Sequence, residues 1–467
     1  MREPHTVVHQ LCQRFNAVIL HLDERVLRVA VADTVPEEMS ETLRFACQRL
    51  IEVECWPQAR IDQLQQQNQT TNDTVSEAHG ETASAALDQL LRLAIQRRAS
   101  DIHLEPQTHG LRIRLRIDGV LQGVARMPEV SSCGLLARLK VLAGLDIAER
   151  RLPQDGQFTR EIDQQTASFR LATLPVMGGE KAVIRLLQSQ SSGLSLEKLG
   201  LPARQLRQLN LALQQPQGLI LVTGPTGSGK TFTLYSSLSA LNQNGKNLCS
   251  VEDPVEIPLA GVNQTQVNPK RGLDFNRVLR ALLRQDPDVI MIGEIRDIET
   301  AEIAVKAAQT GHLVLSTLHT NSTGETLTRL RQMGIPGYLI GSALRLIIAQ
   351  RLVRRLCPHC RQPAQALAHL PTEQWPGTLQ TWRAAGCDHC FSGYFGRIAL
   401  FEVLVVTPRI QNAINADLPL ESVLQLATQQ GMHSLIQSGL EAVSRGETSF
   451  EEMQRITGLE NDAPETV

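Results

Sequence analysis

Residues 218–231 read Gly218-Leu219-Ile220-Leu221-Val222-Thr223-Gly224-Pro225-Thr226-Gly227-Ser228-Gly229-Lys230-Thr231. The first part, up to Thr223, is a short apolar run typical of a buried strand. The rest is a complete Gly-x-x-x-x-Gly-Lys-Thr loop, and residues 232–241 continue with a pattern compatible with a helix. This order predicts a phosphate-binding loop on an α/β sheet. A chance glycine-rich turn is the alternative, and it is disfavoured because every fixed position is present in the required context.

The residue types of this loop suit a nucleoside triphosphate and its magnesium ion. Glycines let backbone N–H groups approach phosphate oxygens, and the N-terminus of the following helix favours an anion. The lysine can reach the β- and γ-phosphates, and the hydroxyl of Thr231 can contact Mg²⁺. The predicted cofactors are ATP and Mg²⁺, and the predicted binding residues are Gly224, Pro225, Thr226, Gly227, Ser228, Gly229, Lys230 and Thr231.

Two acidic segments follow the loop. The first is residues 250–256, Ser-Val-Glu-Asp-Pro-Val-Glu, and the second is residues 289–297, where four apolar residues lead to Gly293 and Glu294. Parallel α/β sheets present reactive groups at the carboxyl ends of their strands, so Glu294 is predicted to orient or deprotonate the attacking water. A usual Walker B strand carries Asp where Gly293 stands. Mg²⁺ is therefore expected to rely on the loop threonine, water and an acid of the first segment, such as Glu252, although ordinary surface ion pairs are the alternative there.

A third apolar strand is predicted at residues 313–318, between His312 and His319. A single histidine is more often a satisfied structural residue than a functional one. Two histidines that bracket a strand of a nucleotide-binding domain are more suggestive, and they could sense the γ-phosphate. The candidate catalytic residues in this part of the chain are Lys230, Glu252, Glu294 and His319.

The N-terminal part is predicted to be a small α/β module over residues 1–58. Its apolar runs at 17–20, 27–31 and 51–55 favour strands, and residues 36–50 favour a helix. Residues 59–83, rich in Gln, Thr, Asn and Ser, have little to bury and are predicted to be a flexible linker.

A second module is predicted from residue 84 to residue 195, and it begins with a helix over 85–98. Residues 111–117 alternate strictly between apolar and charged side chains, so a strand would place its arginines on one face and its aliphatic residues on the other. Asp118-Gly119 then favours a two-residue hairpin turn. A row of guanidinium groups suits phosphate binding, and a solvated strand face is the alternative; the arginines are Arg112, Arg114 and Arg116.

Two Cys-x-x-Cys pairs lie in the third predicted module, residues 196–467, within a loop over 357–390. Four thiolates at this spacing suit tetrahedral Zn²⁺ in a structural role, and the predicted ligands are Cys357, Cys360, Cys387 and Cys390. A redox disulfide or free thiols are the rival interpretation. His359 and His389 are possible substitute ligands, but we interpret them as bystanders.

Composition limits the class of protein. The chain has 46 Lys and Arg residues against 48 Asp and Glu, and 3% aromatic residues, so it lacks the positive charge and stacking surfaces of a dedicated nucleic-acid binder. No segment approaches the roughly 20 apolar residues needed to span a bilayer. The first residues show no apolar signal-peptide core, and we therefore expect a cytoplasmic protein.

These motifs together resemble the GspE/PulE/PilB family of type II secretion and type IV pilus assembly ATPases, over residues 84–460. The likeness is greatest to the assembly branch of that family. It is carried by residues 99–106 (Ala-Ser-Asp-Ile-His-Leu-Glu-Pro), Arg114-x-Arg116-x-Asp118-Gly119, 151–156 (Arg-Leu-Pro-Gln-Asp-Gly), 251–256, 286–297 and 310–321. One departure is Ser322-Thr323, where the family commonly shows Asp-Ala. The chain also lacks the Arg-Leu-Gly-containing repeat that binds cyclic dinucleotides in some relatives.

The resemblance implies a RecA-like P-loop ATPase core, a smaller PAS-like α/β pre-motor domain and a helical C-terminal subdomain over about 408–457. It implies that pre-motor arginines reach the nucleotide phosphates, a role carried here to Arg114 and Arg116. It also implies that residues 357–390 form the family's metal-binding loop.

The resemblance further implies a homohexameric ring that couples ATP turnover to an inner-membrane platform protein and drives pilus assembly or protein secretion. Membrane association would be peripheral, at the cytoplasmic face and through partners, without direct nucleic-acid binding. The rival interpretations are a nucleic-acid translocase and a ring subunit with a decayed ATPase.

Overall fold

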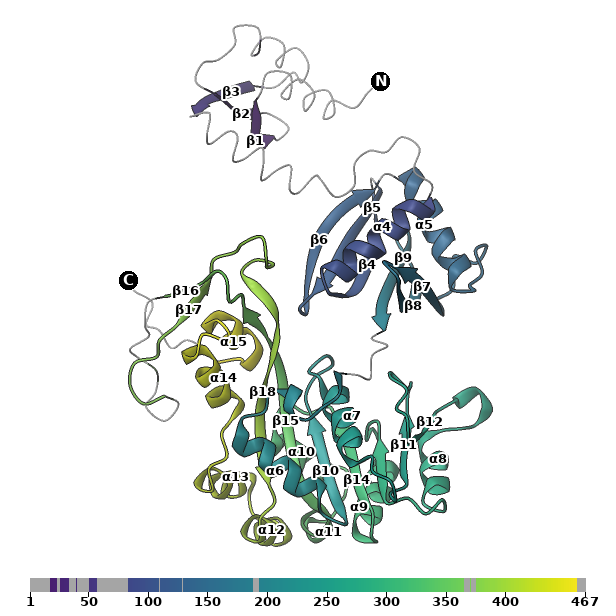
Figure 1. Ribbon diagram of the computed structural model, residues 1–467, viewed down its shortest axis with the longest axis vertical. Coiled ribbons are helices and arrows are strands. Elements are labelled where there is room, and N and C mark those ends of the chain that lie inside the picture. The colour runs from purple at the N-terminus through teal and green to yellow at the C-terminus, as the bar shows by residue number, and fades with distance from the viewer. Residues whose placement is uncertain are drawn as a thin grey trace. The chain divides into compact units, whose positions relative to one another are not determined.

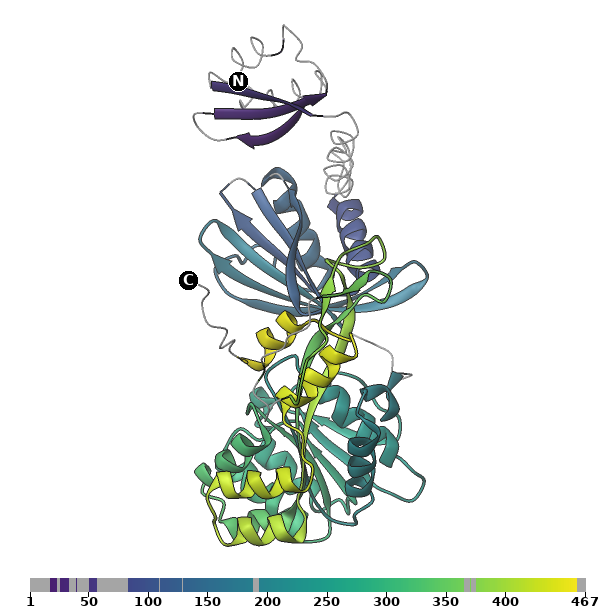
Figure 2. The same ribbon diagram turned by 90° about the vertical axis from the view of Figure 1, so that its left-hand side faces the viewer.

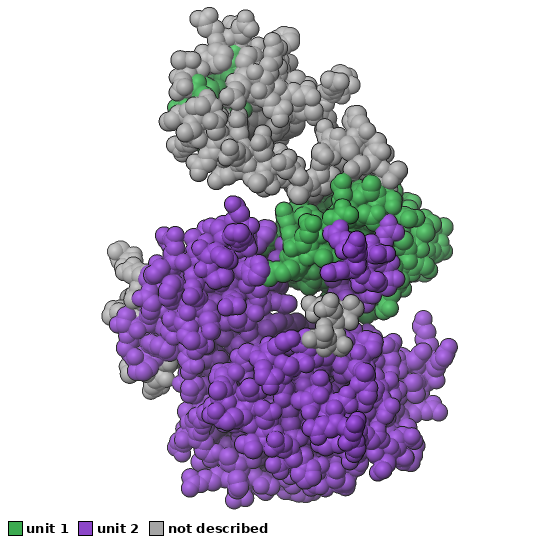
Figure 3. Space-filling model, in the orientation of Figure 1, with its two compact units in different colours: residues 1–116, 121–158, 170–185 green, residues 117–120, 159–169, 186–467 purple. Residues whose placement is uncertain are grey.

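The computed structural model describes residues 17–22, 26–32, 39, 50–56, 83–108, 110–127, 129–187, 193–364, 370 and 375–459. The chain forms two compact units (Figure 3). The first contains residues 1–116, 121–158 and 170–185, and the second contains residues 117–120, 159–169 and 186–467. The helix predicted at 36–50, apart from residues 39 and 50, and the linker predicted at 59–83, apart from residue 83, lie outside the described residues.

The N-terminal strands form a sheet of their own, in the order β1-β2-β3. They are β1 (Val18–Leu22), β2 (Val26–Ala32) and β3 (Leu50–Trp56), and they confirm the three strands predicted from the apolar runs. β1 pairs antiparallel with β2, which pairs parallel with β3. Leu27, Val29 and Val31 on one face of β2 are buried, and Ala30 on the other face is buried as well.

The next part is a six-stranded sheet in the order β6-β5-β4-β9-β8-β7, accompanied by two helices. The arginine-rich segment forms β5, in which the aliphatic residues are buried and the arginines are exposed or half-buried, as the alternation predicts. Asp118 and Gly119 both adopt positive φ, 49° and 87°, which suits a tight hairpin turn. The elements are α4 (Ala83–Gln96), β4 (Ala99–Gln107), β5 (Gly110–Ile117), β6 (Val120–Met127), α5 (Glu129–Leu142), β7 (Gln154–Ile162), β8 (Gln165–Val176) and β9 (Gly179–Leu187).

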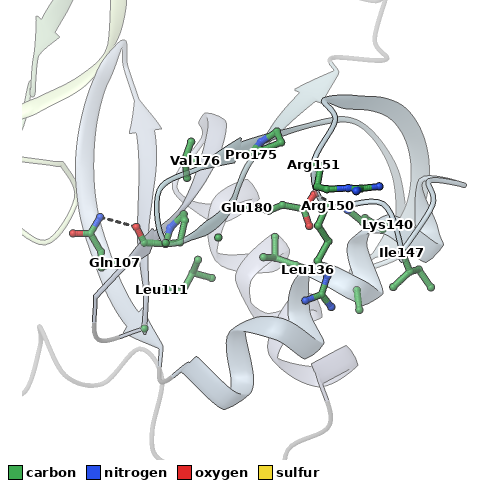
Figure 4. A pocket seen from close by; sticks show the side chains of 15 residues that line it. Gln107, Leu111, Leu136, Lys140, Ile147, Arg150, Arg151, Pro175, Val176 and Glu180 are labelled. Carbon is green, nitrogen blue, oxygen red and sulfur yellow. Dashed lines mark hydrogen bonds and ion pairs between the residues drawn. The ribbon is translucent and has the colours of Figure 1, made fainter.

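A pocket of about 500 Å³ opens beside α5 in the first unit (Figure 4). Lys140 and Glu180 lie in its wall as a buried ion pair with a nitrogen–oxygen distance of 2.6 Å. Lys140 Nζ also donates to the backbone oxygen of Glu149 at 2.7 Å. Arg150 and Arg151 directly follow Glu149. The buried Lys140 therefore fixes the start of the Arg-Leu-Pro-Gln-Asp-Gly segment against α5.

The largest sheet has seven strands in the order β12-β11-β13-β14-β10-β15-β18. All neighbouring pairs are parallel except β15 and β18. The register pairs Thr223 with Leu318 and with Ala349, and Ile292 with Ser316, so the carboxyl ends of the central strands meet at one edge. The strands are β10 (Gly218–Thr223), β11 (Leu248–Glu252), β12 (Val262–Gln266), β13 (Val289–Ile292), β14 (Leu313–Leu318), β15 (Leu344–Leu356) and β18 (Tyr394–Val405).

Helices cover both faces of this sheet. Residues of β10 alternate between two cores, with Leu219 and Leu221 facing one and Ile220 and Val222 facing the other. The first core is completed by α8 (Phe275–Leu282), α9 (Ile298–Gln309), α10 (Thr323–Gln332), α11 (Gly337–Ala343), α12 (Pro408–Asn415) and α13 (Leu420–Gln429), and the second by η2 (Glu197–Leu199), α6 (Ala203–Leu213) and α7 (Lys230–Leu241). A parallel sheet buried on both sides explains why its strands are continuous apolar runs, and the predicted α/β class is confirmed.

The antiparallel pair β15 and β18 is longer than the other strands of the sheet and extends past them (Figures 1 and 2). Residues of this extension, such as Val353 and Leu400, pack with Leu435 and Ala442 of the next helix pair. These C-terminal helices are α14 (Leu435–Ser444) and α15 (Phe450–Thr457), and η3 (Pro269–Arg271), β16 (Arg361–Pro363) and β17 (Trp382–Ala384) complete the described elements. No helix in the described part of the chain is long and apolar enough to cross a membrane.

Candidate active site

The phosphate-binding loop turns tightly between β10 and α7. Gly224, Gly227 and Gly229 have φ values of 147°, 78° and 91°, which other residues rarely adopt. A Cβ at Gly224 would lie 2.5 Å from the backbone oxygen of Gln350, and a Cβ at Gly229 would lie 2.7 Å from the side-chain nitrogen of Gln350. The loop therefore needs glycine for contact as well as for conformation, and it leaves a cradle of backbone groups at the N-terminus of α7.

Lys230 lies across this cradle. Its Nζ donates to the backbone oxygens of Gly224 at 2.7 Å and Pro225 at 3.0 Å, and the residue is 9% exposed. Burial lowers the pKa of Lys230 to about 8, against the opposing effect of the Glu294 carboxylate. A buried amine that donates to neutral carbonyls suits a phosphate anion, and the buried hydroxyl of Ser228 has no hydrogen-bond partner within the described ranges. The loop therefore fits a nucleotide.

We expect the affinity for a non-hydrolysable ATP analogue to fall as pH rises above about 8. A bound triphosphate stabilises protonated Lys230, so binding raises its pKa above the value of about 8 in the free protein. Below pH 8 the Lys230 amine is protonated in both the free and the nucleotide-bound protein, so the affinity does not change with pH. Above pH 8 the dissociation constant rises by up to about tenfold per pH unit. Fluorescence titration between pH 7 and 9.5 measures this. Lys230→Arg stays charged throughout, and an equal slope in that variant would exclude Lys230 as the cause.

Glu294 follows β13 at the same sheet edge and is held by two side chains, Arg296 and His319. Arg296 forms an ion pair with one carboxylate oxygen, and His319 Nε2 lies 3.1 Å from the other. Burial raises the pKa of Glu294, but the hydrogen bond from Arg296 and the nearby His319 outweigh it, so the pKa lies below its usual range. The sequence-predicted pair Glu294 and His319 is thus brought together, with an ionised carboxylate.

Gly293 stands where a Walker B strand usually carries Asp. Its backbone N–H donates to the oxygen of Val251 at 2.8 Å, and a Cβ there would lie 3.2 Å from the same oxygen. This contact is tighter than most Cβ contacts, so β11 and β13 approach closely at this point. The packing gives a physical reason for the glycine and leaves Glu294 as the first acid after the strand.

Glu252 ends β11 and is buried, with 4% exposure. Its carboxylate accepts hydrogen bonds from Tyr235, from Ser250 at 2.5 Å and from Gln264 at 3.0 Å. Burial raises the pKa of Tyr235, with the Glu252 hydrogen bond as a further cause, so the phenol remains the donor. These contacts tie α7 to β11 behind the phosphate-binding loop, whereas Asp253 and Glu256 of the same segment are exposed.

His312 lies at the amino end of β14 and therefore at the opposite edge from His319. Its Nδ1 is 3.0 Å from the backbone oxygen of Ala307 at the end of α9. A strand of this length spans about 20 Å. The structure therefore brings only His319 of the two predicted histidines to the nucleotide edge.

Sequence reasoning missed two residues that β15 places at this edge. Gln350 Oε1 accepts from the Thr233 hydroxyl at 2.7 Å and packs against the loop glycines. Arg351 is 8% exposed and its Nη2 donates to the backbone and side-chain oxygens of Asn321 at 2.8 and 3.1 Å. Burial lowers the pKa of Arg351, and the Lys230 amine experiences its charge. The sequence did contain a signal for these two residues. The apolar run at 346–349 is followed directly by polar side chains, as the apolar run at 289–292 is followed by Gly293 and Glu294.

A pocket of about 620 Å³ adjoins the phosphate-binding loop within the second unit. Gly229 and Phe232 form its border with the loop, and Leu352 and Arg397 of the long strand pair also line it. The pocket therefore lies directly beside the first turn of α7. Its volume falls in the range of small-molecule sites.

Two of the β5 arginines have acidic partners within their own sheet. Arg114 Nη2 lies 2.6 Å from Glu105, and Arg116 Nε lies 3.7 Å from Asp101. The hydrogen bond from Arg114 lowers the pKa of Glu105. Arg112 is exposed. The predicted arginine face of β5 is therefore present, and two of its arginines pair with carboxylates of the strand β4.

The four cysteines of the two Cys-x-x-Cys pairs converge, with all sulfur atoms within 4.8 Å of one another. The Cys357–Cys387 and Cys360–Cys390 sulfur distances are 3.8 and 3.7 Å. Four sulfurs bound at 2.3 Å to a tetrahedral ion lie about 3.8 Å apart, whereas a disulfide requires about 2.05 Å. The cluster fits a metal ion. The neighbouring rings of His359 and His389 contact each other, with centroids 4.9 Å apart.

The parallel sheet covered on both faces, its phosphate-binding loop and the Glu294 carboxylate at the same edge define a P-loop ATPase. Residues 76–455 match the model of a family described as Type II/IV secretion system protein. The chain belongs to this family, which confirms the resemblance noted from its motifs.

Individual relatives agree with this assignment. The chain is 54% identical to the protein transport protein HofB homolog of Escherichia coli K12, over 96% of this chain and 97% of that protein. It is 47% identical to the type IV pilus assembly ATPase PilB of Pseudomonas aeruginosa, over 83% of this chain and 70% of that protein. The crystal structure of the pilus retraction motor PilT with bound ADP is 27% identical and covers 79% of this chain and 96% of its own, with a TM-score of 0.53.

Proposed function

We propose that this chain is the ATP-hydrolysing motor of a type IV pilus assembly or type II secretion apparatus. The observation that carries the proposal is the placement of Glu294, ionised and held by Arg296 and His319, at the sheet edge that also carries the phosphate-binding loop. The names of the relatives and of the family support the choice of pathway. The balanced charge and few aromatic residues weigh against a nucleic-acid translocase.

The chemistry divides among the residues as follows. The loop glycines bind the phosphates through backbone N–H groups, and Lys230 neutralises their charge. Glu294 orients the attacking water, and His319, which contacts Glu294, would report the γ-phosphate to the next helix. Mg²⁺ would be held by Thr231, which is exposed, with support from the 252–256 segment, and it would neutralise charge on the phosphate oxygens. Glu252 positions this segment through its three hydrogen bonds.

The assembly is proposed to be a homohexamer at the cytoplasmic face of the inner membrane, attached peripherally through a platform protein. In such a ring Arg114 and Arg116 would exchange an acidic partner for a nucleotide phosphate. We further propose that the chain is divided into a docking module (1–58), a linker (59–83), a pre-motor domain (84–195) and a motor domain (196–467). Zn²⁺ is the proposed ion of the cysteine cluster, where it would hold the loop closed.

The direct test is ATP hydrolysis by the purified full-length chain with magnesium. We expect phosphate release that saturates with ATP and does not change when single-stranded or duplex DNA is added. Co-purification with inner-membrane proteins of a pilus or secretion system tests the pathway separately. Stimulation by DNA would favour a translocase, and failure to bind or hydrolyse ATP with membrane partners present would refute the motor.

A further inference from the structure

Glu402 lies on β18, and its buried carboxylate faces the first turns of two helices. One oxygen accepts from the backbone nitrogen of Thr323 at 2.8 Å and from its hydroxyl at 2.5 Å. The other accepts from the backbone nitrogen of Leu435 at 3.3 Å. Thr323 is the first residue of α10 and Leu435 is the first residue of α14. A single side chain therefore accepts one first-turn backbone N–H from each of two helices that are far apart in sequence, in addition to the caps that Ser322 and Ser434 supply.

A side chain with two acceptor oxygens suits this buried position. Glu402 is 7% exposed, and a buried carboxylate is tolerated only with several hydrogen bonds. The first N–H groups of a helix have no acceptor within the helix, so the two oxygens of this side chain serve as acceptors for both helix starts. Thr323, which is fully buried, supplies both a backbone and a side-chain donor to it.

The helix held by Glu402 begins directly after the loop that carries His319. This loop is fixed at two further points: Thr320 N donates to Thr223, the residue before Gly224, at 3.1 Å, and Arg351 donates to Asn321. Asn321 N also donates to Glu325 of the first turn of α10 at 2.6 Å. The direction in which the loop leaves β14, and thus the place of the His319 ring beside Glu294, depends on where α10 starts.

We propose that Glu402 is a positioning residue for ATP hydrolysis, which holds the His319 loop in place through α10 and ties the C-terminal helix α14 to the same point. The proposal rests on the ATPase function proposed above and deepens it. Glu402 does not touch the nucleotide edge itself; it acts through Thr323. A displacement of the 319–322 loop that accompanies a change of bound nucleotide is then transmitted to α14 through the Glu402 carboxylate.

Glu402→Gln tests this with little change in shape. A glutamine can keep its oxygen towards Thr323, but its nitrogen then faces the N–H of Leu435, donor against donor. A displacement of the loop by a fraction of an ångström to one ångström lowers kcat by roughly tenfold to a hundredfold. We expect this loss with the KM for ATP within about twofold of the wild type, since the phosphate-binding loop is unaltered. Hydrogen exchange of the Thr323 and Leu435 amides should accelerate together.

Two threonine variants keep the test decisive if Glu402→Gln folds poorly. Thr323→Val removes the hydroxyl donor and should lower kcat in the same direction, while Thr323→Ser should restore it. Glu421→Gln, on the exposed first turn of α13, is the matched control. Unchanged kcat per folded molecule in Glu402→Gln and Thr323→Val would overturn the proposal, as would a KM that rises in step with the loss. An inactive wild type would instead refute the ATPase function itself.

Discussion

Glu294→Gln should bind ATP normally and hydrolyse it about a hundredfold to ten-thousandfold more slowly than the wild type. Glutamine has the same shape and retains an oxygen towards Arg296, so the loop and the nucleotide cradle stay intact. What it lacks is the negative charge and the second proton-accepting oxygen of the carboxylate. Steady-state phosphate release gives the rate, and fluorescence titration with a labelled ATP analogue gives the affinity.

Glu294 has two predicted roles, to orient the attacking water or to deprotonate it, and its low pKa favours the first. An efficient general base has a pKa near the working pH, whereas Arg296 and His319 hold the Glu294 pKa below its usual range. The carboxylate is therefore better suited to orienting the water than to taking its proton early in the reaction. Because the pKa of Glu294 lies below its usual range, protonation of this carboxylate should cause no loss of rate at neutral or mildly acidic pH, as long as the chain remains folded.

Glu299→Gln is the matched control. Glu299 lies on α9, close in sequence to Glu294, and its carboxylate pairs on the surface with Arg280 at 2.5 Å, with half of the side chain exposed. An exposed pair of this kind contributes little to stability, so both binding and turnover should equal the wild type. If Glu294→Gln turned over as fast as this control, Glu294 would have no part in the chemistry.

The sequence predicts the parts of this site that are local. Residues 218–231 contain strand, turn and helix start within one continuous segment, and each has its own residue signal. The cysteine pairs and the alternating β5 arginines are equally local patterns. Such features can be predicted without the tertiary structure because the spacing places the groups of each segment together, whereas the two cysteine pairs meet only through the fold.

The residues that the sequence did not reveal act across long distances along the chain. Gln350 reaches Thr233 and Glu402 reaches Thr323 and Leu435, and only the order of strands in the sheet brings these pairs together. The same reasoning explains why only one of the two predicted histidines lies at the site. His312 and His319 are equivalent as a bracketing pattern, but in a parallel sheet the two ends of β14 lie at opposite edges, and only one carries the nucleotide site.

Replacing Cys387 by serine should abolish stoichiometric zinc binding and loosen the tip of the β15–β18 pair. Structural zinc contributes on the order of 10 kcal/mol in small zinc-binding peptides, far more than a surface contact. Cys357 follows β15 directly and Cys390 lies shortly before β18, so the ion would join the ends of the two strands. Elemental analysis of the purified chain gives the zinc content, and hydrogen exchange near Leu356 and Tyr394 reports the loosening.

His389→Ala distinguishes four cysteine ligands from a mixed site. The His389 ring contacts the His359 ring, and the sulfur distances of 3.6 to 3.8 Å within the cluster already satisfy a tetrahedral ion. This variant should therefore keep one zinc per chain. Because Gln350, Arg351 and Glu402 lie further along the strand pair, where the large sheet supports them, loss of zinc should lower ATP turnover far less than Glu294→Gln does. Zinc retained by Cys387→Ser, or lost from His389→Ala, would show that the ligand set is wrong.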